Sequence, residues 1–513
     1  MAHVRQNGAR RQVSNGSCVT IRLETGTPPA NPAPEESIPA PSPQLAAEHI
    51  VVRLRAAGYE AYFAGGCVRD MLLGLEPKDF DVATSAHPDV VLAMFPRTFA
   101  VGAQFGVILV CQDVDNAAGP GRAREIVTEV ATFRSDVAYQ DGRHPTEVRF
   151  SATPQEDVIR RDFTINGMMF DPVLERQTCS LTSAVLDYVG GRADLRDGII
   201  RAIGEPHRRF EEDKLRMLRA VRFAARFEYT IEPETEGAIR QLAAGIAQVS
   251  RERVRDEITK MLTEGRARRA FELLDATGLL RAVLPEVTRL QNVAQPPEYH
   301  PEGDVWIHTL LVLEKLPAGV SPTLAWGALL HDIGKPATFS HNPPDRIRFN
   351  GHVEVGVRIA HEILRRLRFS NEDCDQILAL VENHMRFGDV GKMKISTLKR
   401  FFRLPKFDEH LALHRLDVTS SHGDLSLYEF AKRKREELPE EEVRPQLLVT
   451  GRDLIDAGYQ PGPRFKEMLQ LAEDAQLEGR IQTREDGLAL IRREILPPTE
   501  TPKNETGKRN PSI

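Results

Sequence analysis

The chain has 513 residues, of which 41% are hydrophobic and 28% are charged, and its formal net charge is −6. A single hydrophobic core rarely grows beyond about 250–300 residues, so we expect more than one domain. The composition is typical of a water-soluble globular protein, and no run of about 18 apolar residues is present that could span a membrane. The net charge neither indicates nor excludes a nucleic-acid binder, because a local basic face matters more than the sum.

The five cysteines, at positions 18, 67, 111, 179 and 374, are scattered without CxxC spacing. This pattern argues against a disulfide framework and against a thiolate zinc site. The N-terminus also lacks an apolar signal core followed by a cleavage site. We therefore expect a cytoplasmic protein.

Both ends of the chain are polar and contain several prolines. Residues 1–43 and 496–513 cannot bury enough apolar surface to offset the entropy of ordering, so we expect disordered tails. A helix is expected to begin after Pro43, where apolar residues trace one face up to Gly58.

The segment Tyr62–Ser85 combines two features that suit phosphate chemistry. An apolar run meets Gly65-Gly66, which lets the backbone approach a ligand closely because glycine has no Cβ. A short amphipathic helix over Val68–Leu73 is expected next, ended by a glycine.

Asp79 and Asp81 follow, two residues apart. On a strand, two such side chains point to the same face, roughly 7 Å apart. This separation suits a pair of Mg²⁺ ions about 4 Å apart, as used in phosphoryl transfer. We expect two further strands of the same sheet, over Val107–Val110 and Ile126–Phe133, joined by a surface loop over 112–124.

Glu129 lies in the second of these strands, and its parity places it on one face. From the residues alone, it could be a solvated glutamate on an edge strand.

Arg160 to Gly167 form the next dense cluster. If a helix begins here, Asp162 and Asn166 stand on one face at i and i+4. The two arginines could then neutralise a triphosphate, while Asp162 and Asn166 bond ribose hydroxyls. A capped helix start with solvated arginines is the alternative.

Glu211–Phe227 shows the clearest helical pattern of the chain, with an apolar stripe opposite a basic one. Asp213 and Arg216 are expected side by side at the margin of the basic face. An arginine ridge of this kind suits the phosphates of a nucleotide or RNA. The ridge consists of Arg216, Arg219, Arg222 and Arg226.

A second constellation lies further along, where an apolar segment runs into His331-Asp332. His308 precedes this pair, and Asp417 follows far downstream. Lone histidines are more often structural than ligands, but an adjacent His-Asp pair at the end of an apolar helix is less easily dismissed. Mixed nitrogen and oxygen ligands suit a divalent transition metal or Mg²⁺.

The first group of motifs resembles the class II tRNA nucleotidyltransferases, the branch that contains CCA-adding enzymes and bacterial poly(A) polymerases. The resemblance rests on Gly65-Gly66, on Asp79-x-Asp81, on RRDFTIN at 160–166 and on EDKLR at 212–216. It implies that Asp79, Asp81 and Glu129 are catalytic, that the two aspartates hold Mg²⁺, and that Asp213 and Arg216 read the base edge of CTP or ATP. The implied nucleotide-binding residues are Gly65, Gly66, Arg69, Arg160, Arg161, Asp162, Asn166, Asp213, Arg216, Arg219 and Arg222.

Residues 300–425 resemble the HD phosphohydrolase superfamily. The resemblance implies a divalent metal (Mg²⁺, Mn²⁺, Ni²⁺ or Co²⁺) held by His308, His331, Asp332 and Asp417. A second metal could use His352 and His384, and Lys335 could meet a phosphate.

Together these resemblances imply an α+β protein with a small mixed-sheet nucleotidyltransferase head followed by a long all-α remainder. The implied domains are a head over 44–175, a neck over 176–245, an RNA-binding body over 246–299, an HD-like domain over 300–437 and a helical tail over 438–495.

The implied activity is addition of CMP, CMP and AMP to the acceptor end of tRNA, with CTP and ATP as substrates. A poly(A) polymerase and an enzyme restricted to CC or A remain open, because they share the short motifs. Two alternatives belong to other functional classes. They are HD-type phosphohydrolysis as the main activity and RNA binding without catalysis. The oligomeric state is not indicated.

Overall fold

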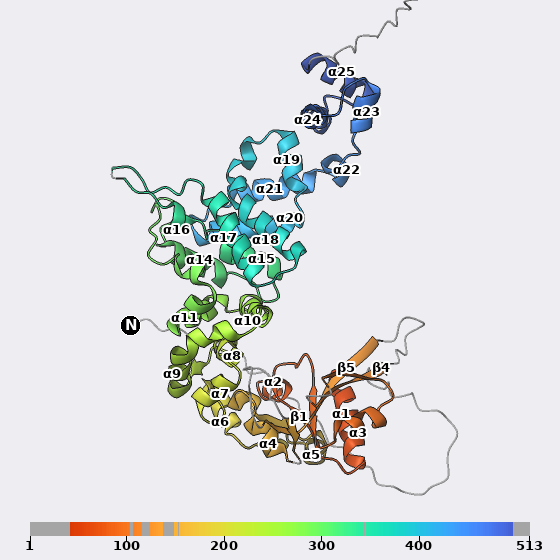
Figure 1. The fold of residues 1–513 in the computed structure, drawn as a ribbon, viewed down its shortest axis with the longest axis vertical. Helices are drawn as coiled ribbons and strands as arrows, with labels where there is room; N and C mark the ends of the chain where they lie inside the picture. Colours follow the sequence, from red (N-terminus) through yellow and green to blue (C-terminus); the bar gives the residue numbers. More distant parts are fainter. Residues whose placement is uncertain are drawn as a thin grey trace, which may run out of the picture.

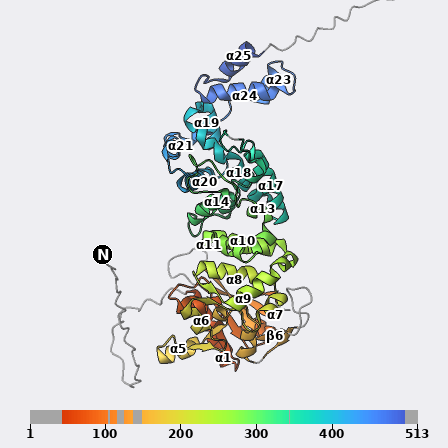
Figure 2. The same ribbon diagram turned by 90° about the vertical axis from the view of Figure 1, so that its left-hand side faces the viewer.

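The structure is a computed structural model that describes residues 42–102, 106–114, 124–136, 148–151, 153–342 and 344–495. The tails predicted over 1–43 and 496–513 lie almost entirely outside these ranges, as does most of the loop predicted over 112–124. The head lies at one end of an elongated molecule and the C-terminal helices lie at the other (Figure 1). Seen from the side, the helical parts stack on the head as a column (Figure 2).

The head is built on a seven-stranded mixed sheet with the strand order β3-β4-β5-β2-β1-β8-β9. Strands β2 and β5 pair in parallel, while the other neighbours are antiparallel. β9 belongs to this sheet, so the sheet extends past the predicted end of the head at residue 175. The strands are β1 Ala61–Ala64, β2 Asp81–Thr84, β3 Thr98–Gly102, β4 Val107–Val114, β5 Arg124–Thr132, β8 Met168–Phe170 and β9 Val185–Asp187.

The helices α1, Pro43–Ala56, and α3, Pro88–Met94, cover one face of this sheet, and the functional motifs lie on the opposite face. α1 packs on β1, β2 and β5, and α3 packs on β4 and β5. The predicted helix after Pro43 is therefore confirmed, and the Ser42 hydroxyl caps it by accepting from the backbone N–H of Leu45. The shorter elements are α2 Gly66–Leu72, α4 Pro154–Ile159, α5 Pro172–Thr178, α6 Gly191–Asp197, the 3₁₀ turn Thr164–Asn166, and two small sheets, β6 Arg134–Asp136 with β7 Val148–Phe150 and β10 Ile199–Ile200 with β11 Thr230–Ile231.

The neck and body are helical, and α8 of the neck packs on α10 and α11 of the body. The helix predicted over 211–227 is wrong in one respect, because the chain breaks at Asp213 between α7 and α8. The helices here are α7 Pro206–Glu212, α8 Leu215–Arg226, α9 Pro233–Leu242, α10 Arg251–Thr263, α11 Ala267–Ala276, α12 Leu279–Val283 and α13 Pro285–Thr288, with a 3₁₀ segment at Ala243–Gln248.

The remaining helices form the second half of the column. They are α14 Val305–Glu314, α15 Pro322–Leu330, α16 Lys335–Thr338, α17 His352–Arg366, α18 Asn371–Asn383, the 3₁₀ segment η4 His384–Lys392, α19 Ile395–Phe402, α20 Phe407–Ser420, α21 Ser426–Glu437, α22 Glu440–Val443, α23 Gly451–Asp456, α24 Arg464–Leu477 and α25 Arg484–Glu494. Among the described residues, none of the helices is both long and apolar enough to cross a membrane.

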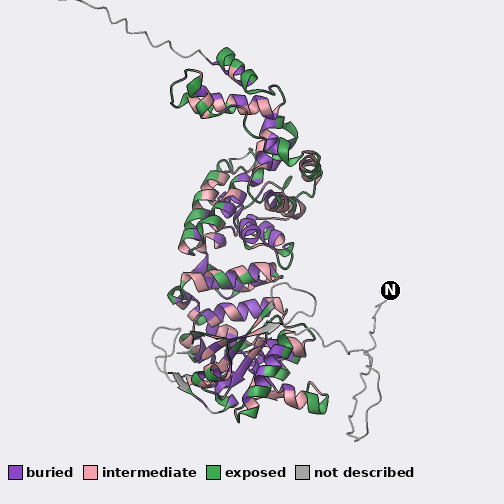
Figure 3. Ribbon diagram, turned by 90° about the vertical axis from the view of Figure 1, so that its right-hand side faces the viewer, coloured by how far each residue is buried: buried purple, intermediate pink, exposed green. Residues whose placement is uncertain are grey.

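One buried apolar cluster runs from Ala47 in the head to Leu413 in α20 (Figure 3). Smaller clusters around Phe401 and around Leu454 hold the last helices together. Head, neck, body and HD-like region therefore share a continuous core, and the overall class is α+β, as predicted.

Candidate active sites

The glycine turn at the start of α2 has a backbone that only glycine adopts easily. Gly65 caps the helix with φ 79° and ψ −128°, and α2 begins at Gly66, two residues earlier than predicted. A Cβ built on Gly65 would lie 3.0 Å from Nη1 of Arg161. Glycine is therefore needed here both for its positive φ and for the approach of a guanidinium.

The aspartate pair straddles the start of β2 and does not lie wholly on it as predicted. β2 begins at Asp81, and Asp79 precedes the strand. The expected alternation nevertheless holds, because Phe80 and Val82 are buried while Asp79 is exposed and Asp81 half-buried.

Glu129 lies on β5, between β4 and β2, so its strand is not an edge strand, although its side chain is exposed as the alternative expected. The parallel register pairs Val82 with Val130, which places Asp81 beside Glu129 on the face opposite α1 and α3. Both carboxylates line one cavity of about 200 Å³ together with Arg160 and Arg161.

The electrostatics of this cavity fit a divalent cation. Burial, Glu129 and Asp79 together raise the pKa of Asp81 to about 7. Burial and Asp79 also raise the pKa of Glu129. A divalent cation between these carboxylates would relieve their mutual repulsion.

The Arg160–Gly167 segment does not begin an α-helix, contrary to prediction. α4 ends at Ile159. Two backbone hydrogen bonds, from Thr164 to Arg201 and from Ile203 to Asp162, then hold the chain extended before one 3₁₀ turn. The predicted contact still forms, because Nδ2 of Asn166 donates to Oδ1 of Asp162 at 3.1 Å.

Asp157 holds both arginines of the motif. Arg160 donates to one of its oxygens at 2.6 Å and Arg161 to the other at 2.9 Å. Asp157 was missed in the sequence, although its i, i+3 and i, i+4 spacing to the arginines is the signal that could have revealed it.

A buried chain of polar contacts joins Arg69, Asn166, Asp162 and Arg219. Nη1 of Arg69 donates to Oδ1 of Asn166 at 2.7 Å, and Nε of Arg219 donates to Oδ2 of Asp162 at 2.8 Å. Burial alone would raise the pKa of Asp162, but Arg219 and Asn166 outweigh it and lower the pKa to about 2. Asp162 is therefore an ionised acceptor at neutral pH.

Asp213 and Arg216 are close in sequence but have separate partners. Asp213 is extended, with φ −146°, and both its oxygens accept from Arg253 of α10, at 2.7 and 3.2 Å. Arg216 donates to Glu212 at 3.0 Å and to the backbone carbonyl of Arg160 at 2.9 Å. Arg253 was missed because it lies 40 residues away in sequence.

The four arginines of the predicted ridge on α8 all have carboxylate partners in the chain. Arg222 is buried and donates to Glu257 of α10 at 2.7 Å. Arg226 lies 3.7 Å from Glu264, and Arg219 is bound to Asp162. The periodicity gave the basic face, but it could not show that α10 covers this face with carboxylates.

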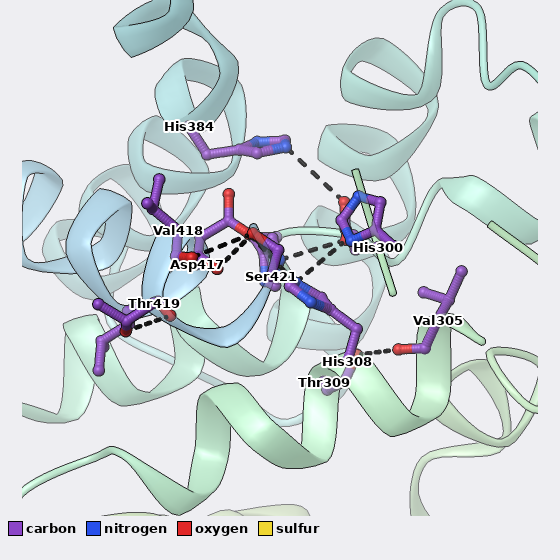
Figure 4. Close-up of polar contacts among 12 residues, drawn as sticks. His300, Val305, His308, Thr309, His384, Asp417, Val418, Thr419 and Ser421 are labelled. Carbon is purple, nitrogen blue, oxygen red and sulfur yellow. Dashed lines mark hydrogen bonds and ion pairs between the residues drawn. The ribbon is translucent and has the colours of Figure 1, made fainter. Parts of the chain in front are cut away.

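The second constellation assembles from five elements. His308 lies on α14, His331 and Asp332 follow α15, His352 begins α17, His384 follows α18 and Asp417 lies on α20. Figure 4 shows His300, His308, His384 and Asp417 side by side.

Asp332 lies at the centre of this cluster. Its Oδ2 lies 3.3 Å from Nε2 of His331 and 3.9 Å from Nε2 of His308. Its Oδ1 lies 3.8 Å from Nε2 of His384 and 3.9 Å from Nε2 of His352. Asp417 lies beside the histidines near Oδ2 of Asp332, with its own Oδ1 3.1 Å from Nε2 of His308.

Each of the four imidazoles is oriented through its Nδ1. His308 donates to Oε1 of Glu302 at 2.7 Å, and the other three reach the backbone carbonyls of Ala328, Phe349 and Val381 at 2.8, 2.9 and 2.7 Å. With Nδ1 held in this way, the four Nε2 atoms lie between 3.3 and 3.9 Å from the carboxylate oxygens of Asp332. Glu302 was missed, and its His-Pro-Glu context gave no signal.

These donors fit metal ions. Two ligand groups, His308-His331-Asp332 and Asp332-His352-His384, each gather within 4.8 Å and share Asp332. The buried Nε2 atoms of His308 and His331 face carboxylate oxygens of Asp417 and Asp332, at 3.1 and 3.3 Å. Lys335, predicted to meet a phosphate, instead binds Asp332 and Gln295, both at 2.7 Å.

The cluster opens on a cavity of about 740 Å³. Burial would lower the pKa of His308, but Asp417 and Glu302 reverse this and raise it to about 9. Burial and His331 lower the pKa of His384 to about 4, so that this imidazole is neutral and free to ligate.

Comparison with known proteins places three families along the chain. The family described as "Poly A polymerase head domain" matches residues 61–201, "Probable RNA and SrmB- binding site of polymerase A" matches 228–290, and "HD domain" matches 305–417.

Curated relatives match over most of the chain. The CCA-adding enzyme of Geobacillus stearothermophilus is 30% identical over 438 residues, 85% of this chain and 93% of that one. The enzyme of Levilactobacillus brevis is 30% identical over 446 residues, 86% and 96% of the two chains. The enzyme of Lactobacillus johnsonii is 36% identical over a shorter stretch, 53% of this chain and 64% of that one.

Among solved structures, the Bacillus stearothermophilus CCA-adding enzyme in complex with CTP superposes with a TM-score of 0.62 at 28% identity, covering 88% of this chain and 97% of that one. The Thermotoga maritima enzyme complexed with tRNA, at 17% identity and a TM-score of 0.51, shares the fold. With its head cavity of converging carboxylates and arginines and with relatives that span nearly its whole length, the chain belongs to the family of CCA-adding enzymes.

Proposed function

We propose that this protein adds CMP, CMP and AMP to the 3′ end of tRNA, using CTP and ATP, in the cytoplasm. The observation that carries the proposal is the pairing of Asp81 with Glu129 above a cavity that Arg160 and Arg161 also line. The head family alone also fits a poly(A) polymerase. The relatives named CCA-adding enzymes favour CCA addition.

The CCA-adding family uses a divalent metal, and we propose Mg²⁺ held by Asp79 and Asp81, with Glu129 beside them. Mg²⁺ bound there would supply positive charge against the transferred phosphoryl group and the leaving pyrophosphate. Arg160 and Arg161, fixed by Asp157, would bind the triphosphate.

The remaining residues of the head and neck would choose the nucleotide. Asp162, held ionised beside Asn166, would accept from a ribose hydroxyl. Asp213 would accept from the exocyclic amino group that cytosine and adenine share, and Arg216 would donate to a ring acceptor. Uracil lacks this amino group, which gives the site a basis for rejecting UTP.

The test uses tRNA transcripts that lack CCA, lack CA or lack only the final A, each incubated with one labelled NTP at a time. Asp79→Ala and Asp81→Ala should each slow addition by orders of magnitude, because each removes a metal ligand, while tRNA binding persists. Asp89→Ala, an exposed carboxylate on α3, is the matched control. Near-normal addition by either variant would remove that aspartate from the mechanism, and long oligo(A) products would favour a poly(A) polymerase.

A second activity is favoured by the four Nε2 atoms that lie between 3.3 and 3.9 Å from the carboxylate of Asp332. We propose that this cluster binds one or two divalent metals and hydrolyses a phosphoester at an RNA end, either a terminal phosphate or a 2′,3′-cyclic phosphate. A bound metal would lower the pKa of its water and so supply a nucleophile near neutral pH.

The variant His331→Ala with Asp332→Ala should lose bound metal and hydrolysis, yet still extend an RNA with a free 3′-hydroxyl. His361→Ala, an exposed histidine on α17, is the control. Metal content is measured alongside hydrolysis in Mg²⁺, Mn²⁺, Ni²⁺ and Co²⁺. A wild-type protein that holds no metal and hydrolyses nothing in any of the four would make this region a structural domain.

A further inference from the structure

We propose that the cavity beside the histidine cluster takes the phosphorylated 3′ end of a nucleotide chain, and that Arg346 and Arg348 bind its next phosphate. The inference rests on the proposed hydrolytic function and adds to it a second anion subsite and a substrate class.

Both arginines lie on the segment between α16 and α17. The backbone of Arg348 is hydrogen-bonded in both directions to Ser340, at 3.0 Å, which holds this part of the segment extended. Side chains alternate along it, since Arg346 and Arg348 are exposed while Ile347 and Phe349 are half-buried. Two arginines at positions i and i+2 of an extended chain point to the same side and can bind the same ligand.

The arginines open on the same cavity as the metal-binding cluster. Arg346 and Arg348 line the space of about 740 Å³ that Asp332, His384 and Asp417 also line. This volume is within the range of ligand sites, about 300–1,000 Å³, and far exceeds the space that a lone phosphate needs.

Neither guanidinium has an ion pair or side-chain hydrogen bond within the described ranges, in contrast to Arg366 of α17, which holds Glu286 at 2.6 Å. Asp424, an acidic group on the cavity wall, accepts instead from the backbone N–H of Ser426. The two arginines are therefore free to bind an anion from outside the chain.

A nucleoside monophosphate has only one phosphate, and this phosphate must lie at the metal-binding cluster to be hydrolysed. The arginines would then stay unused. A nucleotide that also carries a phosphate on its 5′-oxygen, as the 3′-terminal residue of an RNA chain does, presents a second anion one sugar away. Guanidinium groups bind phosphate through paired hydrogen bonds. Tyr299, Phe349 and Met385, also on the cavity wall, offer apolar and aromatic surface to the base.

The reaction balances without an oxidant or reductant. The oxygen of water forms a bond to the terminal phosphorus, the bond from this phosphorus to the ribose 3′-oxygen breaks, and that oxygen takes a proton. The products are inorganic phosphate and a free 3′-hydroxyl, which is the group that nucleotide addition extends.

The test compares kcat/KM for adenosine 3′-monophosphate, adenosine 3′,5′-bisphosphate and a 3′-phosphorylated diribonucleotide, using the full chain in Mn²⁺ and in Ni²⁺. The wild type should favour the two probes with a second phosphate by about tenfold or more. In Arg346→Ala with Arg348→Ala this preference should fall close to unity, mainly through KM. Arg358→Ala, an exposed arginine on α17 that does not line the cavity, should keep the wild-type preference.

Equal wild-type rates on all three probes, or a double variant that keeps the preference, would overturn the subsite. A preference for the bisphosphate but not for the dinucleotide would overturn the RNA end as substrate and indicate a free nucleotide. Absence of hydrolysis in the wild type would refute the proposed hydrolytic function together with this inference, whereas hydrolysis with unchanged preference refutes the inference alone.

Discussion

Arg253 holds the side chain of Asp213 in position. We expect its removal to alter the choice of nucleotide through Asp213, although Arg253 itself is not proposed to contact the nucleotide. Two guanidinium nitrogens of Arg253 hold both oxygens of Asp213, and the carboxylate also accepts from the backbone N–H of Leu215 at 3.1 Å. In Arg253→Ala only the Leu215 contact remains. The Asp213 side chain can then rotate and be solvated.

The size of the effect follows from the contact. The pair is well shielded, with side-chain exposures of 24% and 17%. A charge-assisted hydrogen bond in such a setting contributes about 1.5–3 kcal/mol, so kcat/KM for CTP and ATP should fall by about 10- to 100-fold. Arg253→Lys keeps the charge but loses the planar fork, so it should be intermediate.

The assay is single-nucleotide addition to tRNA with each of the four NTPs, combined with thermal unfolding. Arg240→Ala, which breaks an exposed ion pair with Glu236 on α9, is the matched control. If Arg253 acts through Asp213, then Asp213→Ala with Arg253→Ala should be no worse than Asp213→Ala alone. Additive losses, or an Arg253→Ala enzyme with the wild-type ranking of NTPs, would refute the reasoning.

Three further outcomes are expected. Gly65→Ala should lose about 1–2 kcal/mol of stability and most of its nucleotide addition. Gly58 has a similar φ of +89° but open space where a Cβ would lie, so Gly58→Ala should lose stability alone. Thermal unfolding measures the stability of the two variants, and single-turnover rates measure their nucleotide addition. Asp157→Asn should raise KM for CTP and ATP, because it releases two guanidinium groups at once; unchanged KM values would remove Asp157 from triphosphate positioning. Because the pKa of Asp81 is raised to about 7, its protonated form stabilises the fold at low pH and this contribution is lost as pH rises through about 7. Since Mg²⁺ replaces that proton, the Mg²⁺-induced rise in melting temperature should grow from about pH 6 to about pH 8, and Asp81→Asn should abolish this trend.

Local features of the head could be predicted because short-range physics decides them. The burial of Phe80 and Val82 follows from the alternation of a strand, and the start of α1 at Pro43 follows from proline at the first helical turn. The need for glycine at position 65 likewise follows from a tight turn before a helix.

The partners of the charged side chains were decided only by tertiary structure. Arg222 and Glu257 are 35 residues apart, and Asp213 and Arg253 are 40 apart, so no spacing rule joins them. Periodicity shows that a helix has a basic face, but whether that face meets RNA or a neighbouring helix depends on which helix packs against it. The same holds for the histidine cluster. The sequence indicated its members one by one, but the packing of five elements brought their side chains around Asp332, because side-chain direction is set by contacts between segments distant in the chain.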